Sequence, residues 1–105
     1  GVLLFRKRLF EEAREALYEA LTKAEAINQR VQCCYINMYL ADVYKEMVKH
    51  ELAFNYLATA EQVACECHNI DLLYKCKIRE AKMLYALGRD ADVKKVIESA
   101  QLHMD

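Results

Sequence analysis

The chain has 105 residues, of which 55% are hydrophobic and 30% charged, with 15 Lys+Arg against 16 Asp+Glu and a formal net charge of −1 at pH 7. This is the composition of one folded domain, not of a disordered segment. A charge balance so near zero, with no long basic run, argues against nucleic acid and against an anionic membrane surface as partners.

The sequence has no proline and only two glycines, Gly1 and Gly88. Proline and glycine are the strongest helix breakers, so we expect a nearly all-helical chain. No apolar run reaches the roughly 20 residues that a membrane-spanning helix needs. An odd count of five cysteines and no recognisable secretory signal favour a reducing intracellular location, cytoplasmic or nuclear.

The first part of the chain, residues 2–27, has apolar residues at the three- and four-residue spacing of a helix. Arg6, Lys7 and Arg8 fall where a turn would divide it, but no glycine marks that turn. Two interpretations therefore stay open for this stretch: a helix hairpin, or one long helix.

The middle and last parts each read as a pair of helices. In residues 30–69 the turn falls near Lys49 and His50, between two apolar stripes of helical period. In residues 70–105, Asn69 or Asp71 can cap the first helix, and Gly88 followed by Asp90 predicts a C-terminal glycine and then an N-cap for the second.

An internal repeat connects these parts. Small residues recur at an offset of 40, which an unrelated helical bundle has no reason to maintain but a stack of repeated units does. The recurring positions are Ala13 and Ala53 with Val93 in the third copy, Ala20 with Ala60 and Ala100, and Ala41 with Ala81.

Two-helix units with small residues at the helix crossings resemble the tetratricopeptide repeat in a longer form of about 40 residues. Gly88 matches the family's turn glycine, whereas Arg8 and Val48 stand there in the other copies. Lys77 and Glu80 also occupy positions where the family tends to have large apolar residues. The match is therefore to a degenerate repeat.

We predict an all-α fold of about five helices, arranged as antiparallel helix hairpins stacked into an α-solenoid. The domain spans 1–105, with a partial repeat over 1–29 and repeats over 30–69 and 70–105. The chain ends on apolar Leu102 and Met104 without a polar capping helix, so we expect a fragment of a longer array or ends that another chain, or a second copy, covers.

Catalytic chemistry has little support. Ser99 is the only serine, and the sequence contains neither a glycine-rich phosphate loop nor a His-Glu-x-x-His motif. We therefore expect no enzyme activity and no cofactor.

The cysteines offer a possible zinc site, because Cys65, Cys67 and His68 close one helix at the edge where Cys33 and Cys34 begin another. However, a Cys-x-Cys pair on a helix points its thiols to different sides, and the usual Cys-x-x-Cys spacing is absent. We expect packed, reduced cysteines and no bound metal.

The resemblance implies a working surface on the concave face lined by the first helix of each repeat. Mixed apolar, aromatic and lysine side chains there are typical of a peptide-binding groove, although Tyr35 and Met38 could equally pack against the next copy. The residues assigned to partner binding are Tyr35, Met38, Asp42, Lys75, Ile78, Lys82 and Tyr85, with Lys45 on the same face and Phe5 at its edge.

The expected function is therefore a protein–protein interaction scaffold that holds a peptide or helix of a partner. The alternative is a structural subunit of a large complex, as in proteasome-lid or cell-cycle ubiquitin-ligase scaffolds, where the apolar ends matter and the groove does not.

Overall fold

The computed structural model describes the backbone of residues 2–104 and the side chains of residues 6–101. The interpretations of Phe5, Leu102 and Met104 therefore concern side chains outside the described range. The helices are α1 (Val2–Ala26), α2 (Arg30–Glu46), α3 (His50–Glu66), α4 (Ile70–Ala86) and α5 (Asp90–Met104). With no strand between residues 2 and 104, the prediction of an all-α fold with five helices is confirmed.

Helix α1 settles the question left open for residues 2–27. It runs without a break from Val2 to Ala26, so Arg6, Lys7 and Arg8 lie inside a helix and not at a turn. Because no glycine or other breaker interrupts this stretch, nothing opposes continuous backbone hydrogen bonding. This part of the chain therefore forms one long helix and no hairpin.

The remaining helices follow a strict interval: α2, α3, α4 and α5 begin at residues 30, 50, 70 and 90, so each starts 20 residues after the one before. Two such intervals make the 40 residues at which the sequence repeats. The loops share a left-handed residue at the same interval, namely Asn28 (φ 57°), Val48 (φ 61°), His68 (φ 53°) and Gly88 (φ 74°).

Each loop ends its helix by the same hydrogen-bond pattern. After α2, the Lys49 N–H donates to the Tyr44 carbonyl at 2.9 Å and the Val48 N–H donates to the Lys45 carbonyl at 3.0 Å. These are the two bonds of a Schellman motif, which needs a left-handed residue after the helix. Equivalent bonds follow α1, α3 and α4, so the turns are conformationally alike even though only one contains glycine.

Val48 is the least suited of the four to this conformation, because a β-branched side chain clashes with the left-handed backbone. We expect Val48→Gly to raise the free energy of unfolding by about 1 kcal/mol. Gly88→Val should lower it by a similar amount through backbone strain alone, since a Cβ at Gly88 would meet no atom within 4 Å. Thermal melts of both variants check this, and a Val48→Gly variant that melts below wild type would contradict it.

The starts of the helices bear out one predicted cap and correct another. Asn69 caps α4: its side-chain oxygen accepts from the Leu72 N–H at 3.1 Å. Asp90 was predicted to be the N-cap of α5, but it is the first residue of the helix. The capping position falls to Arg89, whose carbonyl accepts from the Val93 N–H, because the loop between α4 and α5 is one residue shorter than the Gly88–Asp90 pattern suggests.

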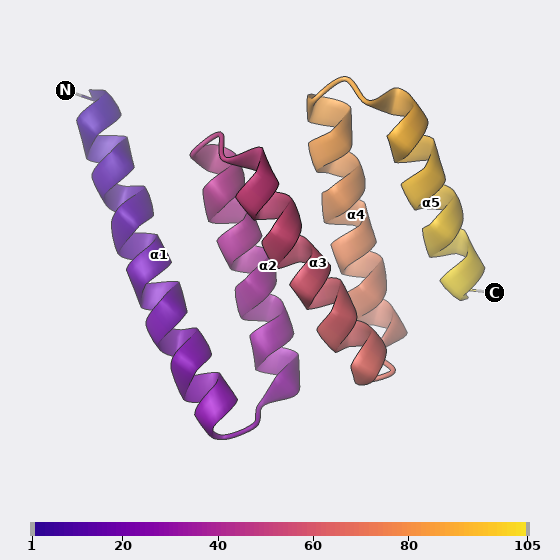
Figure 1. The fold of residues 1–105 in the computed structure, drawn as a ribbon, viewed down its shortest axis with the longest axis horizontal. Helices are drawn as coiled ribbons and strands as arrows, with labels where there is room; N and C mark the ends of the chain where they lie inside the picture. Colours follow the sequence, from indigo (N-terminus) through magenta and orange to yellow (C-terminus); the bar gives the residue numbers. More distant parts are fainter. Residues whose placement is uncertain (1, 105) are drawn as a thin grey trace.

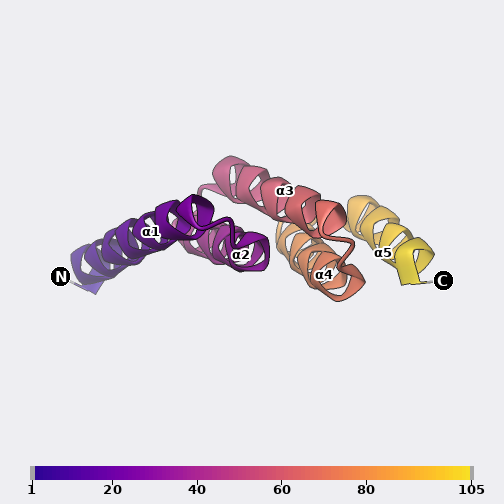
Figure 2. The same cartoon turned by 90° about the horizontal axis from the view of Figure 1, so that it is seen from below.

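Consecutive helices run antiparallel and pack in chain order, with α2 also contacting α4 (Figure 1). Seen from below, the array bends, with α3 on the outer side and α2 and α4 beneath it (Figure 2). The Cα extents of 47 × 39 × 16 Å describe a thin body. Among the described residues, the backbone of α1 packs against α2 and the backbone of α5 packs against α4.

The core lies where α2, α3 and α4 meet. Ala41, Ala53, Ala60 and Ala64 have no exposed surface there, and small side chains let helices approach closely. Larger side chains fill the remaining space, with Met38, Leu40 and Leu57 the largest of those fully buried.

Three tyrosines connect α1 to this core. The Tyr18 hydroxyl lies 2.7 Å from that of Tyr44 and also contacts that of Tyr56. The rings of Tyr44 and Tyr56 stack at 5.3 Å. Burial raises the pKa of Tyr18 and of Tyr44, which keeps both hydroxyls protonated and able to donate. The cluster fixes α1 against α2 and α3.

A charged cluster lies between α3 and α4 and consists of Glu61, Lys77 and Glu80. The Lys77 ammonium lies 3.5 Å from Glu61 and 3.8 Å from Glu80. One Glu61 carboxylate oxygen, Oε1, is buried without a hydrogen-bond partner among the described residues. Burial, together with the hydrogen bond to Glu80 and its charge, raises the pKa of Glu61 to about 8 despite the Lys77 ammonium.

Candidate functional site

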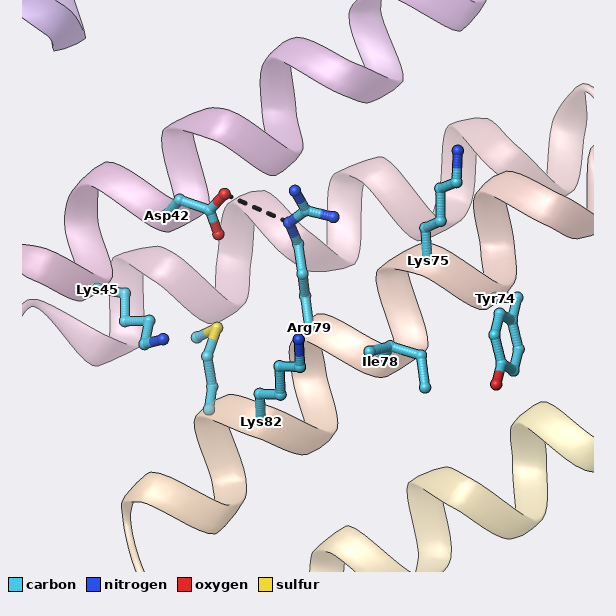
Figure 3. Close-up of a pocket in the computed structure, with 8 residues that line it drawn as sticks. Asp42, Lys45, Tyr74, Lys75, Ile78, Arg79 and Lys82 are labelled. Atoms are coloured by element: carbon cyan, nitrogen blue, oxygen red, sulfur yellow. Dashed lines mark hydrogen bonds and ion pairs between the residues drawn. The ribbon is translucent and has the colours of Figure 1, made fainter.

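The candidate site is a cavity of about 460 Å³ between α2 and α4. Its volume is within the range of small ligand-binding pockets. Two elements build it: α2 contributes Asp42 and Lys45, and α4 contributes Tyr74, Lys75, Ile78, Arg79, Lys82 and Met83 (Figure 3). We call this cavity the α2–α4 groove.

Most of the face assigned from the sequence comes together here. Asp42, Lys75, Ile78 and Lys82 all line the α2–α4 groove, as does Lys45. Lys75 and Lys82 are seven residues apart, about two helical turns, and both extend from α4 toward the side of α2 (Figure 3). Tyr35 stands beside this set, since the Lys75 ammonium donates to its hydroxyl at 3.3 Å and lies 5.6 Å from its ring centroid.

Three assigned residues do not line the groove: Tyr35, which lies beside it, and Met38 and Tyr85. Met38 is fully buried, so its assignment to partner binding is corrected: it is a core residue. Its sulfur accepts from Arg79 Nη1 at 3.7 Å. Tyr85 is 72% exposed on α4 and lies outside the cavity, because it is one turn beyond the segment of α4 that faces α2.

The groove carries more positive than negative charge. Its four cationic side chains, Lys45, Lys75, Arg79 and Lys82, face one carboxylate, Asp42. Arg79 Nε donates to Asp42 Oδ2 at 3.3 Å, as drawn in Figure 3. Among the described side chains, neither Lys45 nor Lys82 has a carboxylate within ion-pair distance. The hollow therefore attracts anions.

Three groove residues were not predicted from the sequence: Tyr74, Arg79 and Met83. Of these, Arg79 carries the charge. The signal was present, because Arg79 follows Lys75 by four residues and precedes Lys82 by three, the spacings that share a helix face. Its role depends on Asp42, 37 residues away, and that pairing is visible only once α2 and α4 are placed side by side.

The cysteines are a separate feature. Cys33, Cys34 and Cys76 are buried, whereas Cys65 is exposed. The Cys34 thiol donates to the Ala60 carbonyl at 3.3 Å. Burial raises the pKa of Cys34 and of Cys76, and each thiol adjoins the other, so both stay protonated and pack as small apolar groups.

Within residues 6–101, no group of three or more His, Cys, Asp or Glu side chains is arranged to hold a metal ion. None of the described helices combines the length and the apolar character needed to cross a bilayer. When the chain is compared with protein-family models, with curated proteins and with solved structures, none matches.

Proposed function

We propose that the chain is a non-enzymatic interaction module of the tetratricopeptide-like, α-solenoid type, which binds an acidic segment of a partner protein in the α2–α4 groove. The observation that carries the proposal is the groove itself: four cations and one carboxylate around a hollow whose floor includes Ile78 and Met83. The 20-residue helix interval and the thin, bent array support the repeat architecture.

The groove offers the two kinds of contact that peptide recognition requires. Ile78 is half-buried, so an apolar anchor placed on its exposed part would lose contact with water and gain residence time. Met83 is nearly covered and belongs to the core. Lys75 and Lys82 are exposed and would mainly speed association and fix the orientation of an acidic segment. A short peptide with acidic residues around one apolar side chain meets both conditions.

Charge reversal at the two exposed lysines tests the proposal. Peptides are first selected on the wild-type protein from a display library, and we expect acidic residues around an apolar anchor. The variant Lys75→Glu/Lys82→Glu should bind the selected peptide at least about tenfold more weakly, with a loss that shrinks as salt is added. Fluorescence anisotropy at low and high salt measures both effects.

The matched control is Lys94→Glu/Lys95→Glu, which makes the same charge change on exposed positions of α5. It should bind like wild type, and both variants should melt within the small range expected of surface substitutions. A library that yields no acidic peptide, or a selected peptide that binds both variants equally, would overturn the proposal.

The second candidate is a structural subunit, favoured by exposed apolar side chains on α1 and α5, the two outermost helices of the array (Figure 1). Leu9 on α1 is 47% exposed and Ile97 on α5 is 44% exposed. If the chain acts as a strut, changing these residues to Glu disrupts its assembly with a neighbouring module, while the reversed lysines leave that assembly unchanged.

A further inference from the structure

The α2–α4 groove has four cationic side chains but only one carboxylate, Asp42, among its lining residues. Lys45 and Lys82 have no acidic partner among the described side chains, and they come from opposite walls of the same hollow. In Figure 3, Lys45 extends from α2 toward α4, and Lys82 extends toward the pair formed by Asp42 and Arg79. Three cations from two helices thus line the same hollow.

Arg79 differs from the two lysines because it is already engaged. Its Nε donates to Asp42 at 3.3 Å, but the guanidinium carries further N–H groups, and among the described residues Nη1 contacts only the weak acceptor Met38 Sδ. The Asp42 carboxylate competes with any incoming anion for Arg79. A singly charged carboxylate of the partner would bind Arg79 no more tightly than Asp42 does. A dianion with three acceptor oxygens would bind it more tightly.

We propose that the α2–α4 groove binds a phosphorylated side chain of its partner, with the phosphoryl group held by Lys45, Arg79 and Lys82. This inference rests on the proposed function, because it specifies the kind of acidic segment that the groove prefers. The apolar surface of Ile78 takes a neighbouring side chain of the same segment, and Lys75, held against Tyr35, stays outside the phosphoryl site. The phosphoryl group is bound and not transferred.

Three fluorescein-labelled peptides test the preference. They share a sequence of glycine, serine and one leucine, and they differ at one position, which is serine, glutamate or phosphoserine. The phosphoserine peptide should bind about tenfold more tightly than the glutamate peptide, and the serine peptide should bind most weakly. Lys45→Gln/Lys82→Gln should remove the difference between phosphoserine and glutamate, whereas Lys94→Gln/Lys95→Gln should keep it.

Asp42→Asn gives an independent readout, because it removes the competing carboxylate while leaving the three cations in place. It should tighten binding of both anionic peptides and shift the melting temperature little, since Asp42 is half-exposed. Inorganic phosphate, titrated at constant ionic strength, should shift the NMR signals of Lys45, Arg79 and Lys82 in a saturable way.

The outcomes distinguish a failure of the phosphoryl preference from a failure of the proposed acidic-segment groove. If glutamate and phosphoserine peptides bind equally and phosphate produces no saturable shift, the phosphoryl preference is wrong and the acidic-segment groove stands. If none of the peptides binds better than the serine peptide, the groove proposal fails as well. Saturable phosphate shifts that persist in Lys45→Gln/Lys82→Gln would place the anion elsewhere and would also overturn the inference.

Discussion

At high pH, replacing Glu61 with glutamine is expected to stabilise the fold by an amount on the order of a few kcal/mol. Glu61 is mostly covered between α3 and α4, and burial together with Glu80 raises its pKa from 4.5 to about 8. The folded protein therefore binds a proton on this carboxyl group that the unfolded chain has already released at the same pH. Glutamine imitates the protonated form, because it is neutral and its amide can donate to Glu80.

The pH dependence follows from the direction of this shift. Between about pH 4.5 and 8 the folded state holds more protons than the unfolded state, so wild-type stability falls as the pH rises through this window. Glu61→Gln should melt like wild type near the lower end and progressively above it toward the upper end, by about 4 to 8 °C for each kcal/mol. Thermal melts at several pH values measure the difference.

Glu46→Gln, on an exposed position of α2, is the matched control and should show no comparable trend. If the advantage of Glu61→Gln were the same at every pH, the proton would not be held at this site. A variant less stable than wild type at high pH would mean that the ion pair with Lys77 outweighs the burial of the charge.

Ala60→Leu is the second large effect, with an expected loss of about 1 to 3 kcal/mol in the free energy of unfolding. Ala60 has no exposed surface, and its carbonyl accepts from the Cys34 thiol of α2 at 3.3 Å. Three added carbons at this crossing must push α2 away from α3 or force strained rotamers.

Ala86→Leu makes the same chemical change at an exposed position near the end of α4 and should alter stability by no more than about 0.5 kcal/mol. Chemical denaturation of the two variants compares them directly. If Ala60→Leu were neutral while Ala86→Leu were costly, the small residues at offset 40 would not set the helix crossings.

The sequence predicted the helices well because their signals are local. Apolar spacing of three and four, the scarcity of breakers and the Asn69 cap depend on residues within one or two turns of each other. The same local view failed at Asp90, where the loop geometry decides which residue begins the helix. Local signals also did not decide whether residues 2–27 form a hairpin or one long helix, because the absence of a helix breaker is weaker evidence for a continuous helix than its presence is for a turn.

The candidate site was predicted only in part, because it depends on contacts between segments far apart in the chain. Residues such as Asp42 and Lys82 were found from their helical face. The burial of Met38 and the pairing of Arg79 with Asp42 both depend on how closely α4 approaches α2, and no local pattern reports that distance. The raised pKa of Glu61 has the same origin, since Glu80 and Lys77 belong to the neighbouring helix.

The most direct test of the central claim locates the bound segment. Amide and side-chain NMR signals of the wild-type protein are followed while the selected acidic peptide is added. If the segment binds in the α2–α4 groove, saturable shifts will be concentrated on α2 and α4, at Lys45, Lys75, Ile78 and Lys82, with little change on the outer positions of α1 and α5. Shifts centred instead on Leu9 of α1 or Ile97 of α5, with the groove signals unmoved, would contradict binding in the groove and favour the structural-subunit alternative.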